Sequence, residues 1–466
     1  MVAMSMADGF ARLTGQPQCV LVHVDVGTQM LGCAMHNASV ARCPVLVFAG
    51  LSPFTLEGEM RGSRTEYIHW LQDAPDQKQI VAQYCRYTGE IKTGKKVKQI
   101  VNRALQIATS DPKGPSYLVG AREVMEEDVT PYHLDPEAWV SVAPTALPPD
   151  AVEEIVSLFA AASNPLIITG YSGRNHATVA QLVKLVESIP GIRVVDTLGS
   201  DVCFPFTHRA SLGVRIGRDQ SIVDADLILV LDCDVPWIPT QCQPKKDAKI
   251  LHIDIDPLKC NMAVHYIPAS RRFRADSETA LRQLNNHITS EEKYNNLARK
   301  EPYATRWKQL AQSKEASLAD IAGRAAPPAR TEPPSVSYLC SRLRNECPKD
   351  TIWCVEAVTN AMAVYEQLQA DEPGHLVNGG GGGLGWSGGG TLGVKLAADW
   401  MAGGTGKGNF VCEIVGDGTY LFGVPGTVYW IAMRYKIPTL TVILSNKGAF
   451  LLVSQRLQVL SLLGLI

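Results

Sequence analysis

The sequence lacks the features that define several large classes of protein. Its 466 residues include no run of 18 or more apolar residues, so we predict no membrane-spanning helix and no membrane partner. Lysine and arginine total 44 against 46 acidic residues, and no basic block stands out, so nucleic acid is not an expected partner. The opening "MVAMSMADGFARLTG" lacks a basic segment followed by a long apolar core, so no secretory leader is expected there.

The twelve cysteines include no CxxC pair and are scattered along the chain. Cys340, Cys347 and Cys354 are seven residues apart and would roughly share a face on one helix, which leaves a metal site as an alternative. The scatter favours buried thiols of an intracellular protein, and we predict a cytoplasmic location.

Length and composition are typical of a globular protein with several domains. Hydrophobic residues make up 46% of the chain and charged residues 19%, which supplies ample core for the two to four domains that the length suggests. Short apolar runs alternate with helical patterns, which predicts parallel sheets covered by helices on both faces. Proline-rich segments suggest a first domain at 1–135, a central domain at 148–290, a connector and linker at 291–335, and a last domain at 336–466.

Individual elements follow from the same patterns. Apolar runs at 19–26, 44–50 and 115–120 predict strands, and the spacing over 95–110 predicts a helix. Asp150 is expected to cap the helix that begins "AVEEIVSLFAAA". The last domain is expected to hold a helix at 336–347, strands at 351–357, 409–415 and 439–446, and a helix at 423–435.

A glycine tract, "NGGGGGLGWSGGGTLGVKLAADW" at 378–400, is the first candidate binding element. A glycine-rich turn before a helix directs backbone N–H groups and the helix N-terminus towards an anion, often phosphate. The glycines are too dense to fix the register of a dinucleotide-binding G-x-G-x-x-G, and a flexible or packing-driven loop is the alternative.

Asp417 and Asn446 form the second candidate. Asp417 lies in "CEIVGDGTYLFG" directly after an apolar strand, and Asn446 ends the next apparent strand. Consecutive strands are usually neighbours in a sheet, and ligands bind at the carboxyl ends of parallel strands. A carboxylate and an amide oxygen there suit Mg²⁺ with substrate phosphates.

These residues resemble the thiamine diphosphate enzymes, specifically the acetolactate synthase-like branch, whose diphosphate motif is GDG followed after roughly 25–30 residues by Asn. The resemblance implies an α/β protein of three doubly wound parallel-sheet domains, the first and last incomplete. It implies that Mg²⁺ is bound by Asp417, Asn446 and the backbone carbonyl of Gly448, with Ser445 where relatives often have Asn. The implied cofactor residues are Gly383, Leu384, Gly385, Gly416, Asp417, Gly418, Thr419 and Asn446.

The resemblance covers nearly the whole chain. "MADGFARLTGQP" at 6–17 and the stretch 26–50 are similar to the pyrimidine-binding domain, and "ILHIDIDP" at 250–257 is similar to the central domain. "WLQDAPDQ" at 70–77 resembles a loop that places a glutamine near the substrate, here Gln72. Leu384 matches a bulky apolar residue that braces the bent cofactor from below, so Gln72 and Leu384 are the implied catalytic residues.

The implied function is thiamine diphosphate- and Mg²⁺-dependent decarboxylation of a 2-oxo acid with carboligation as an additional outcome. Alternatives are a benzaldehyde lyase- or 2-hydroxyacyl-CoA lyase-like enzyme acting on an aldehyde or 2-oxo acid, a non-catalytic relative, and a Rossmann dehydrogenase. The resemblance also implies a homodimer or homotetramer. Some relatives carry FAD, but the glycines of "ITGYSGRN" at 168–175 do not support a flavin here.

One residue that the resemblance implies is missing from the sequence. Relatives carry a glutamate that hydrogen-bonds the pyrimidine ring, and counting back from Ala7-Asp8-Gly9-Phe10 places it immediately before Met1. The tail "AFLLVSQRLQVLSLLGLI" at 449–466 also matches nothing expected after the diphosphate motif. We therefore expect a fragment of a family member, with a truncated non-catalytic relative as the alternative.

Overall fold

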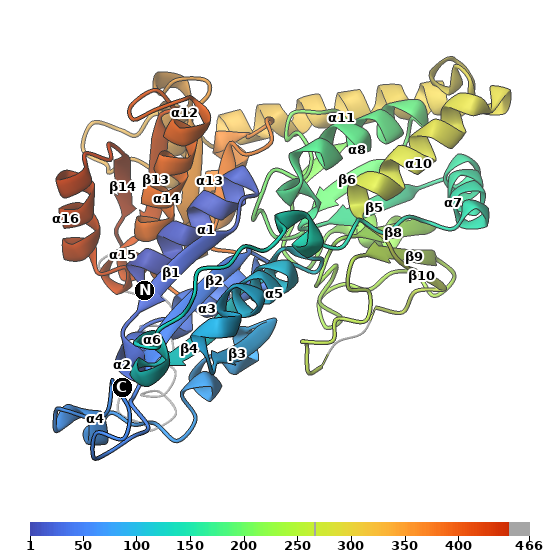
Figure 1. Ribbon diagram of the computed structural model, residues 1–466. Coiled ribbons are helices and arrows are strands. Elements are labelled where there is room, and N and C mark those ends of the chain that lie inside the picture. Colours follow the sequence, from blue (N-terminus) through green and yellow to red (C-terminus); the bar gives the residue numbers. More distant parts are fainter. Residues whose placement is uncertain (265–266, 447–466) are drawn as a thin grey trace, which may run out of the picture. The chain divides into compact units, whose positions relative to one another are not determined.

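The computed structural model describes residues 1–264 and 267–446, and the ribbon is shown in Figure 1. The chain divides into two compact units. Unit 1 comprises residues 1–143 and 354–356 together with the described residues from 379 onward, and unit 2 comprises residues 144–353 and 357–378. The four-part division expected from the sequence stays a prediction.

Three sheets confirm the expected α/β class. Their strand orders are β1-β2-β4-β3, β10-β9-β8-β5-β6-β7 and β12-β11-β13-β14. Every pairing in the first two sheets is parallel, as is the pairing of β13 with β14. Because parallel neighbours need crossover connections, the chain alternates strands with helices.

Unit 1 contains the first sheet and most of the third. Its first part consists of α1 (Val2–Thr14), β1 (Gln18–Val22), α2 (Val24–Gln29), α3 (Gly32–Val40), β2 (Val45–Leu51), α4 (Ile68–Leu71), β3 (Tyr87–Ile91), α5 (Val97–Thr109), β4 (Ser116–Ala121) and α6 (Arg122–Met125). Its second part consists of the end of β11 (Ile352–Glu356), α14 (Trp386–Met401), β13 (Val411–Gly416), α15 (Asp417–Phe422), α16 (Pro425–Tyr435) and β14 (Leu440–Leu444).

The apolar run at 19–26 is not one strand, which corrects the sequence prediction. Strand β1 ends at Val22, and α2 begins at Val24. Val24 has a φ of 37°, a left-handed value that no extended strand contains. The chain therefore turns after His23, and the second half of the run forms a helix that packs beside β2.

Helices α1 and α14 of unit 1 pack so closely that glycine is needed at the contact (Figure 1). A Cβ on Gly9 would lie 2.2 Å from the carbonyl oxygen of Gly390, and one on Gly393 would lie 2.0 Å from that of Met6. Atoms do not approach this closely without displacing backbone. The glycines at 389 and 393 thus serve the packing of α14 against α1, and Gly390 leaves room for the Trp386 ring of its own helix; packing is one of the two alternatives that the sequence leaves open for the tract.

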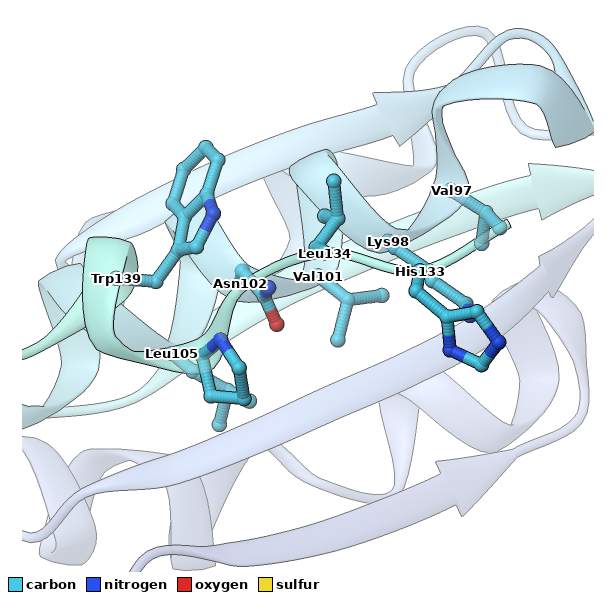
Figure 2. A pocket seen from close by; sticks show the side chains of 9 residues that line it. Val97, Lys98, Val101, Asn102, Leu105, His133, Leu134 and Trp139 are labelled. Atoms are coloured by element: carbon cyan, nitrogen blue, oxygen red, sulfur yellow. The ribbon is translucent and has the colours of Figure 1, made fainter.

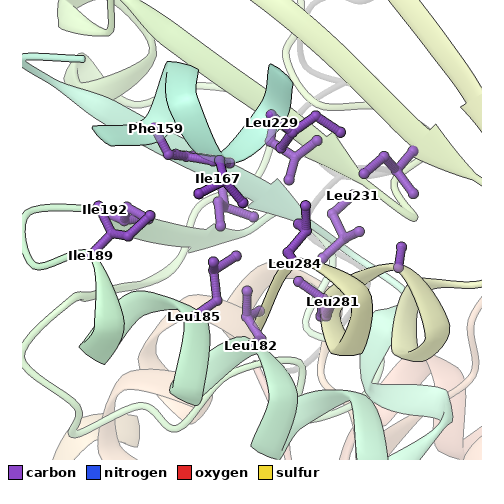
Figure 3. Packing of buried hydrophobic residues seen from close by; sticks show 14 of the residues in the cluster. Phe159, Ile167, Leu182, Leu185, Ile189, Ile192, Leu229, Leu231, Leu281 and Leu284 are labelled. Carbon is purple, nitrogen blue, oxygen red and sulfur yellow. The ribbon is translucent and has the colours of Figure 1, made fainter. Parts of the chain in front are cut away.

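Unit 2 surrounds the six-stranded sheet. Its elements are α7 (Pro149–Ala161), β5 (Pro165–Thr169), α8 (His176–Ser188), β6 (Arg193–Asp196), β7 (Ser211–Val214), α9 (Gln220–Asp224), β8 (Leu227–Leu231), β9 (Lys249–Asp254), β10 (Arg271–Arg274), α10 (Ser277–Ser290), α11 (Tyr303–Gly323), α12 (Val336–Glu346), α13 (Ala361–Leu368) and β12 (Leu376–Asn378). Figure 3 shows one of its apolar clusters, in which Phe159 of α7 and Leu182 of α8 pack with Ile167, Leu229 and Leu284.

Asp150 does not cap α7, which corrects a second expectation. Pro149 takes the first helical position and Pro148 the cap, because proline has no N–H to leave unsatisfied there. Asp150 lies within the first turn, where its charge still opposes the positive end of the helix dipole.

Candidate cofactor site

The site begins where β13 and β14 end beside each other. The two strands pair in parallel with Gly416 opposite Leu444, as expected for consecutive strands. Gly416 is the N-cap residue of α15, and Asp417 is its first residue. Polar residues that follow the two strands therefore meet at one edge of the sheet, where parallel sheets bind ligands.

The Asp417 carboxylate bridges these two strand ends. Its Oδ1 accepts the N–H of Gly418 at 2.8 Å, while its Oδ2 accepts the Ser445 hydroxyl at 3.1 Å and the Asn446 N–H at 3.2 Å. The adjacency predicted from sequence is thus present. Gly448, the third expected ligand of Mg²⁺, lies outside the described residues.

The glycine tract reaches the same region from the start of α14. Between Gly379 and Gly385, Leu384 is the single residue with a side chain, and it is half-buried. Gly385 caps α14 with a φ of 91°. A Cβ there would lie 2.8 Å from backbone atoms of Phe422 and Gly423, so the tract packs against the end of α15, the helix that begins with Asp417.

Sequence patterns did not identify two glutamates near the start of α14, Glu356 and Glu413. Glu356 ends β11, and its carboxylate accepts the N–H groups of Gly385 at 3.1 Å and Ser387 at 2.7 Å. Burial raises the pKa of Glu356 to about 7, although the hydrogen bonds from Ser387 and Gly385 oppose the shift. Buried Glu413 of β13 accepts the Thr441 hydroxyl at 2.8 Å, and burial raises its pKa as well.

Asn37 on α3 is a third residue that sequence patterns did not identify. Its Nδ2 donates to the carbonyl of Gly383 at 2.7 Å, and its Oδ1 accepts the N–H of Gly383 at 2.9 Å. A Cβ on Gly381 or Gly383 would lie within 2.9 Å of its Oδ1, so the tract needs glycine to reach α3. The two partners are 346 residues apart, and no local spacing could indicate their contact.

The other predicted residues occupy two separate places in unit 1. Thr419 is buried in α15 and lines a small cavity with Glu413. Gln72 follows α4, where its N–H donates to the carbonyl of Ile68 at 3.0 Å. The structure describes no hydrogen bond from Gln72 to the residues of the glycine tract, so its place near a substrate stays a prediction.

The donor chemistry fits a diphosphate held through a hard cation. Asp417 and Asn446 offer carboxylate and amide oxygens, the ligands that Mg²⁺ takes in proteins. The N–H groups of Gly381, Gly382 and Gly383 already donate to the Gly379 carbonyl, His36 Nε2 and Asn37 Oδ1, so a phosphate contact by the glycine tract stays a prediction. The cysteines do not form a competing metal site, because Cys340 lies on α12 and Cys354 on β11, and the described residues hold no group of three or more His, Cys, Asp or Glu that could bind a metal ion.

A depression elsewhere in unit 1 is distinct from these residues. It has a volume of about 440 Å³ and lies between α5 and the segment that follows α6 (Figure 2). Among its polar lining residues, Lys98 and His133 are exposed and Asn102 is half-buried, and none of the predicted site residues lines it. The lining residues are Val97, Lys98, Val101, Asn102, Leu105, His133, Leu134, Pro136 and Trp139.

Together, sheets of parallel strands and a GDG–Asn pair beside a glycine tract are the features expected of an α/β enzyme with a diphosphate cofactor. Residues 1–80, 152–284 and 357–459 match, in this order, the N-terminal TPP binding domain, the central domain and the C-terminal TPP binding domain of thiamine pyrophosphate enzymes. The chain belongs to the thiamine pyrophosphate enzyme family, and thiamine diphosphate, the same compound, is the cofactor of that family.

Individual relatives place the chain in the group of this family that includes benzoylformate decarboxylase and acetolactate synthase. The chain is 24% identical to benzoylformate decarboxylase of Pseudomonas aeruginosa over 463 residues, which covers 95% of this chain and 76% of the relative. It is 23% identical to the acetolactate synthase isozyme 3 large subunit of Escherichia coli, covering 96% and 74% of the two chains. The crystal structure of benzoylformate decarboxylase from Polynucleobacter necessarius has the same fold, with a TM-score of 0.77 at 19% identity over 97% of this chain and 78% of that one.

No described helix is both long enough and apolar enough to cross a membrane.

Proposed function

We propose that this chain takes part in the thiamine diphosphate- and Mg²⁺-dependent decarboxylation of a 2-oxo acid. The observation that carries the proposal is the Asp417 carboxylate, which contacts Ser445 and Asn446 where two parallel strands end beside the glycine tract. Asp417 and Asn446 would hold the metal ion that anchors the diphosphate. When bound, the cofactor supplies a thiazolium carbon that adds to the carbonyl carbon and accepts the electrons released with carbon dioxide.

The net reaction sets what the chain's own residues must do. The substrate loses its carboxylate as carbon dioxide and takes up a proton, which gives an aldehyde. The site must therefore hold the diphosphate, fix the cofactor's bend through Leu384, and keep the reacting carbon away from bulk water. The similarity to a benzoylformate decarboxylase, whose alignment covers 95% of this chain, supports a 2-oxo acid as the substrate class.

Carboligation is a second candidate outcome, and the acetolactate synthase relative that matches 96% of this chain favours it. The two outcomes differ only in what is added to the substrate carbon that has lost carbon dioxide. A proton gives an aldehyde, and a second carbonyl compound gives a new carbon–carbon bond. Benzaldehyde lyase- or 2-hydroxyacyl-CoA lyase-like chemistry and a non-catalytic relative remain the alternatives.

A binding experiment tests the anchor before any turnover assay. The melting temperature is measured during titration with thiamine diphosphate and Mg²⁺, for the unmodified chain, Asp417→Ala, Asn446→Ala and the exposed control Asp247→Ala. We expect stabilisation of the unmodified chain and of Asp247→Ala, and its loss in the two site variants. No stabilisation of the unmodified chain, or equal stabilisation of all four proteins, would contradict the proposal.

Turnover then separates the outcomes. Carbon dioxide release is followed with benzoylformate and with pyruvate, and the products are analysed for an aldehyde or for a hydroxyketone. Aldehyde from either acid supports simple decarboxylation, whereas a hydroxyketone supports carboligation. Cofactor binding without release of carbon dioxide from a broad panel of 2-oxo acids would favour the non-catalytic alternative.

A further inference from the structure

Leu384 is the single side chain in a seven-residue tract of otherwise bare backbone, from Gly379 to Gly385. Glycine has more conformational freedom than any other residue, so such a tract samples many conformations unless other groups hold it. A brace for a cofactor must be presented in one conformation. The residues that hold the backbone on either side of Leu384 therefore decide whether it can act.

The backbone before Leu384 is held by Asn37. The carboxamide of this residue bonds both the carbonyl and the N–H of Gly383, at 2.7 and 2.9 Å, as a neighbouring strand would. Asn37 is 1% exposed, so water does not compete for these bonds. Two bonds to one residue fix the orientation of both peptide groups of Gly383, including the one that leads into Leu384.

The backbone after Leu384 is held by Glu356. One carboxylate oxygen accepts the N–H of Gly385 and the other that of Ser387, at 3.1 and 2.7 Å. Trp386, between these two, is itself held through its indole by Asp8. Asn37 lies on α3 and Glu356 ends β11, so the two tethers come from separate elements of unit 1.

We propose that Asn37 and Glu356 are positioning residues that fix the peptide groups on the two sides of Leu384 and so preset the bend of the bound cofactor. This inference rests on the proposed function for the role of Leu384. The tethers themselves exist without any ligand, and they are tested without one.

Amide hydrogen exchange of the cofactor-free protein tests the tethers. Asn37→Leu keeps the branched shape of the side chain, although leucine is larger, and removes both bonds to Gly383. Its matched control is Asn285→Leu in unit 2, which is also 1% exposed and loses two 2.9 Å bonds to Gln181. We expect exchange within residues 379–387 to accelerate about tenfold or more in Asn37→Leu, and to be unchanged there in Asn285→Leu.

Glu356→Gln is the second variant, and it keeps one acceptor oxygen while losing the other. Exchange at Gly385 and Ser387 is expected to accelerate, with circular dichroism confirming that the chain stays folded. Unchanged protection of residues 379–387 in both variants would overturn the proposal, as would equal acceleration in Asn285→Leu.

The cofactor-bound protein provides the functional readout. We expect exchange of the cofactor's C2 proton, followed by NMR, to slow about tenfold or more in Asn37→Leu, while its dissociation constant changes less than about threefold. Normal C2 exchange in a variant with a loosened tract would also overturn the positioning role. If the unmodified chain binds no cofactor, the proposed function fails, and the amide exchange result still decides whether the tethers fix the tract.

Discussion

The indole N–H of Trp386 donates a hydrogen bond to Oδ2 of Asp8 at 2.8 Å, joining residues 378 positions apart. Both side chains are buried, with Trp386 at the start of α14 and Asp8 within α1. A donor to a buried carboxylate is worth more than a neutral hydrogen bond. This contact therefore ties the beginning of the helix that follows the glycine tract to the first helix of the chain.

Trp386→Phe should lower the free energy of unfolding by roughly 1–3 kcal/mol, because it removes a donor to a buried carboxylate and part of a packed side chain. Urea denaturation measures the change. Trp70→Phe is the control, because Trp70 is 51% exposed and should tolerate the exchange. Equal midpoints for the two variants would contradict the assigned contact.

Gly393→Ala should destabilise the protein by about 1–3 kcal/mol or more, because the new methyl group would lie 2.0 Å from the backbone oxygen of Met6. Gly426→Ala is a matched helical control with nothing within 4 Å of the added carbon, and it should be neutral or slightly stabilising. Thermal unfolding compares them. A stable Gly393→Ala would mean that α1 and α14 do not pack at this distance.

Stability should fall as pH rises through the range in which Glu356 titrates. Burial raises the pKa of Glu356 from 4.5 to about 7, so between these values the folded chain keeps a proton that the unfolded chain has released. Unfolding therefore becomes easier with rising pH across this window, by on the order of 3 kcal/mol at most.

The matching variant is Glu356→Gln, which has no proton to lose. Urea denaturation at pH 5, 6, 7 and 8 should show a smaller decline for Glu356→Gln than for the unmodified chain, and an unaltered decline for the exposed control Glu332→Gln. Parallel pH profiles for all three proteins would show that Glu356 does not carry the effect.

Removal of divalent cations should abolish the stabilisation by thiamine diphosphate. A ligand present at 100 times its dissociation constant adds about 2.7 kcal/mol to the folded state, which corresponds to a rise of a few degrees in the melting temperature. EDTA should remove this rise, and excess Mg²⁺ should restore it. A rise that persists in EDTA would mean that the diphosphate is held without the Asp417–Asn446 cation site.

Lys259→Met should destabilise unit 2 by about 3–5 kcal/mol. The ammonium of Lys259 is buried and pairs with Asp234 at 2.6 Å and with the buried carboxylate of Asp254. The substitution would leave the Asp254 carboxylate without this cation in a region of low dielectric. Lys249→Met removes a surface pair with Glu154 at 3.3 Å, and it should cost at most about 1 kcal/mol. Chemical denaturation of both variants compares the two costs, and a similar cost for both would contradict the assignment.

The sequence by itself determined the α/β class, because near-continuous apolar strands alternate with helices along the chain. It also determined that Asp417 and Asn446 lie together. Both follow consecutive strands, and the carboxyl ends of paired parallel strands necessarily share one edge of a sheet. The prediction of one strand over 19–26 was wrong, because the chain turns at Val24. The prediction that Asp150 caps a helix was also wrong, because the helix already begins at Pro149.

The tertiary structure alone decided what surrounds the glycine tract. Asn37 and Asp8 each lie more than 300 positions along the chain from the residue that they contact. Glu356 is nearer, about 30 positions from Gly385, but it belongs to another element. A glycine pattern is the same for a phosphate cradle and for a close helix contact, because both need backbone without a Cβ. The structure separates them: Gly389 and Gly393 serve the contact with α1, while Gly383 and Gly385 hold the turn around Leu384.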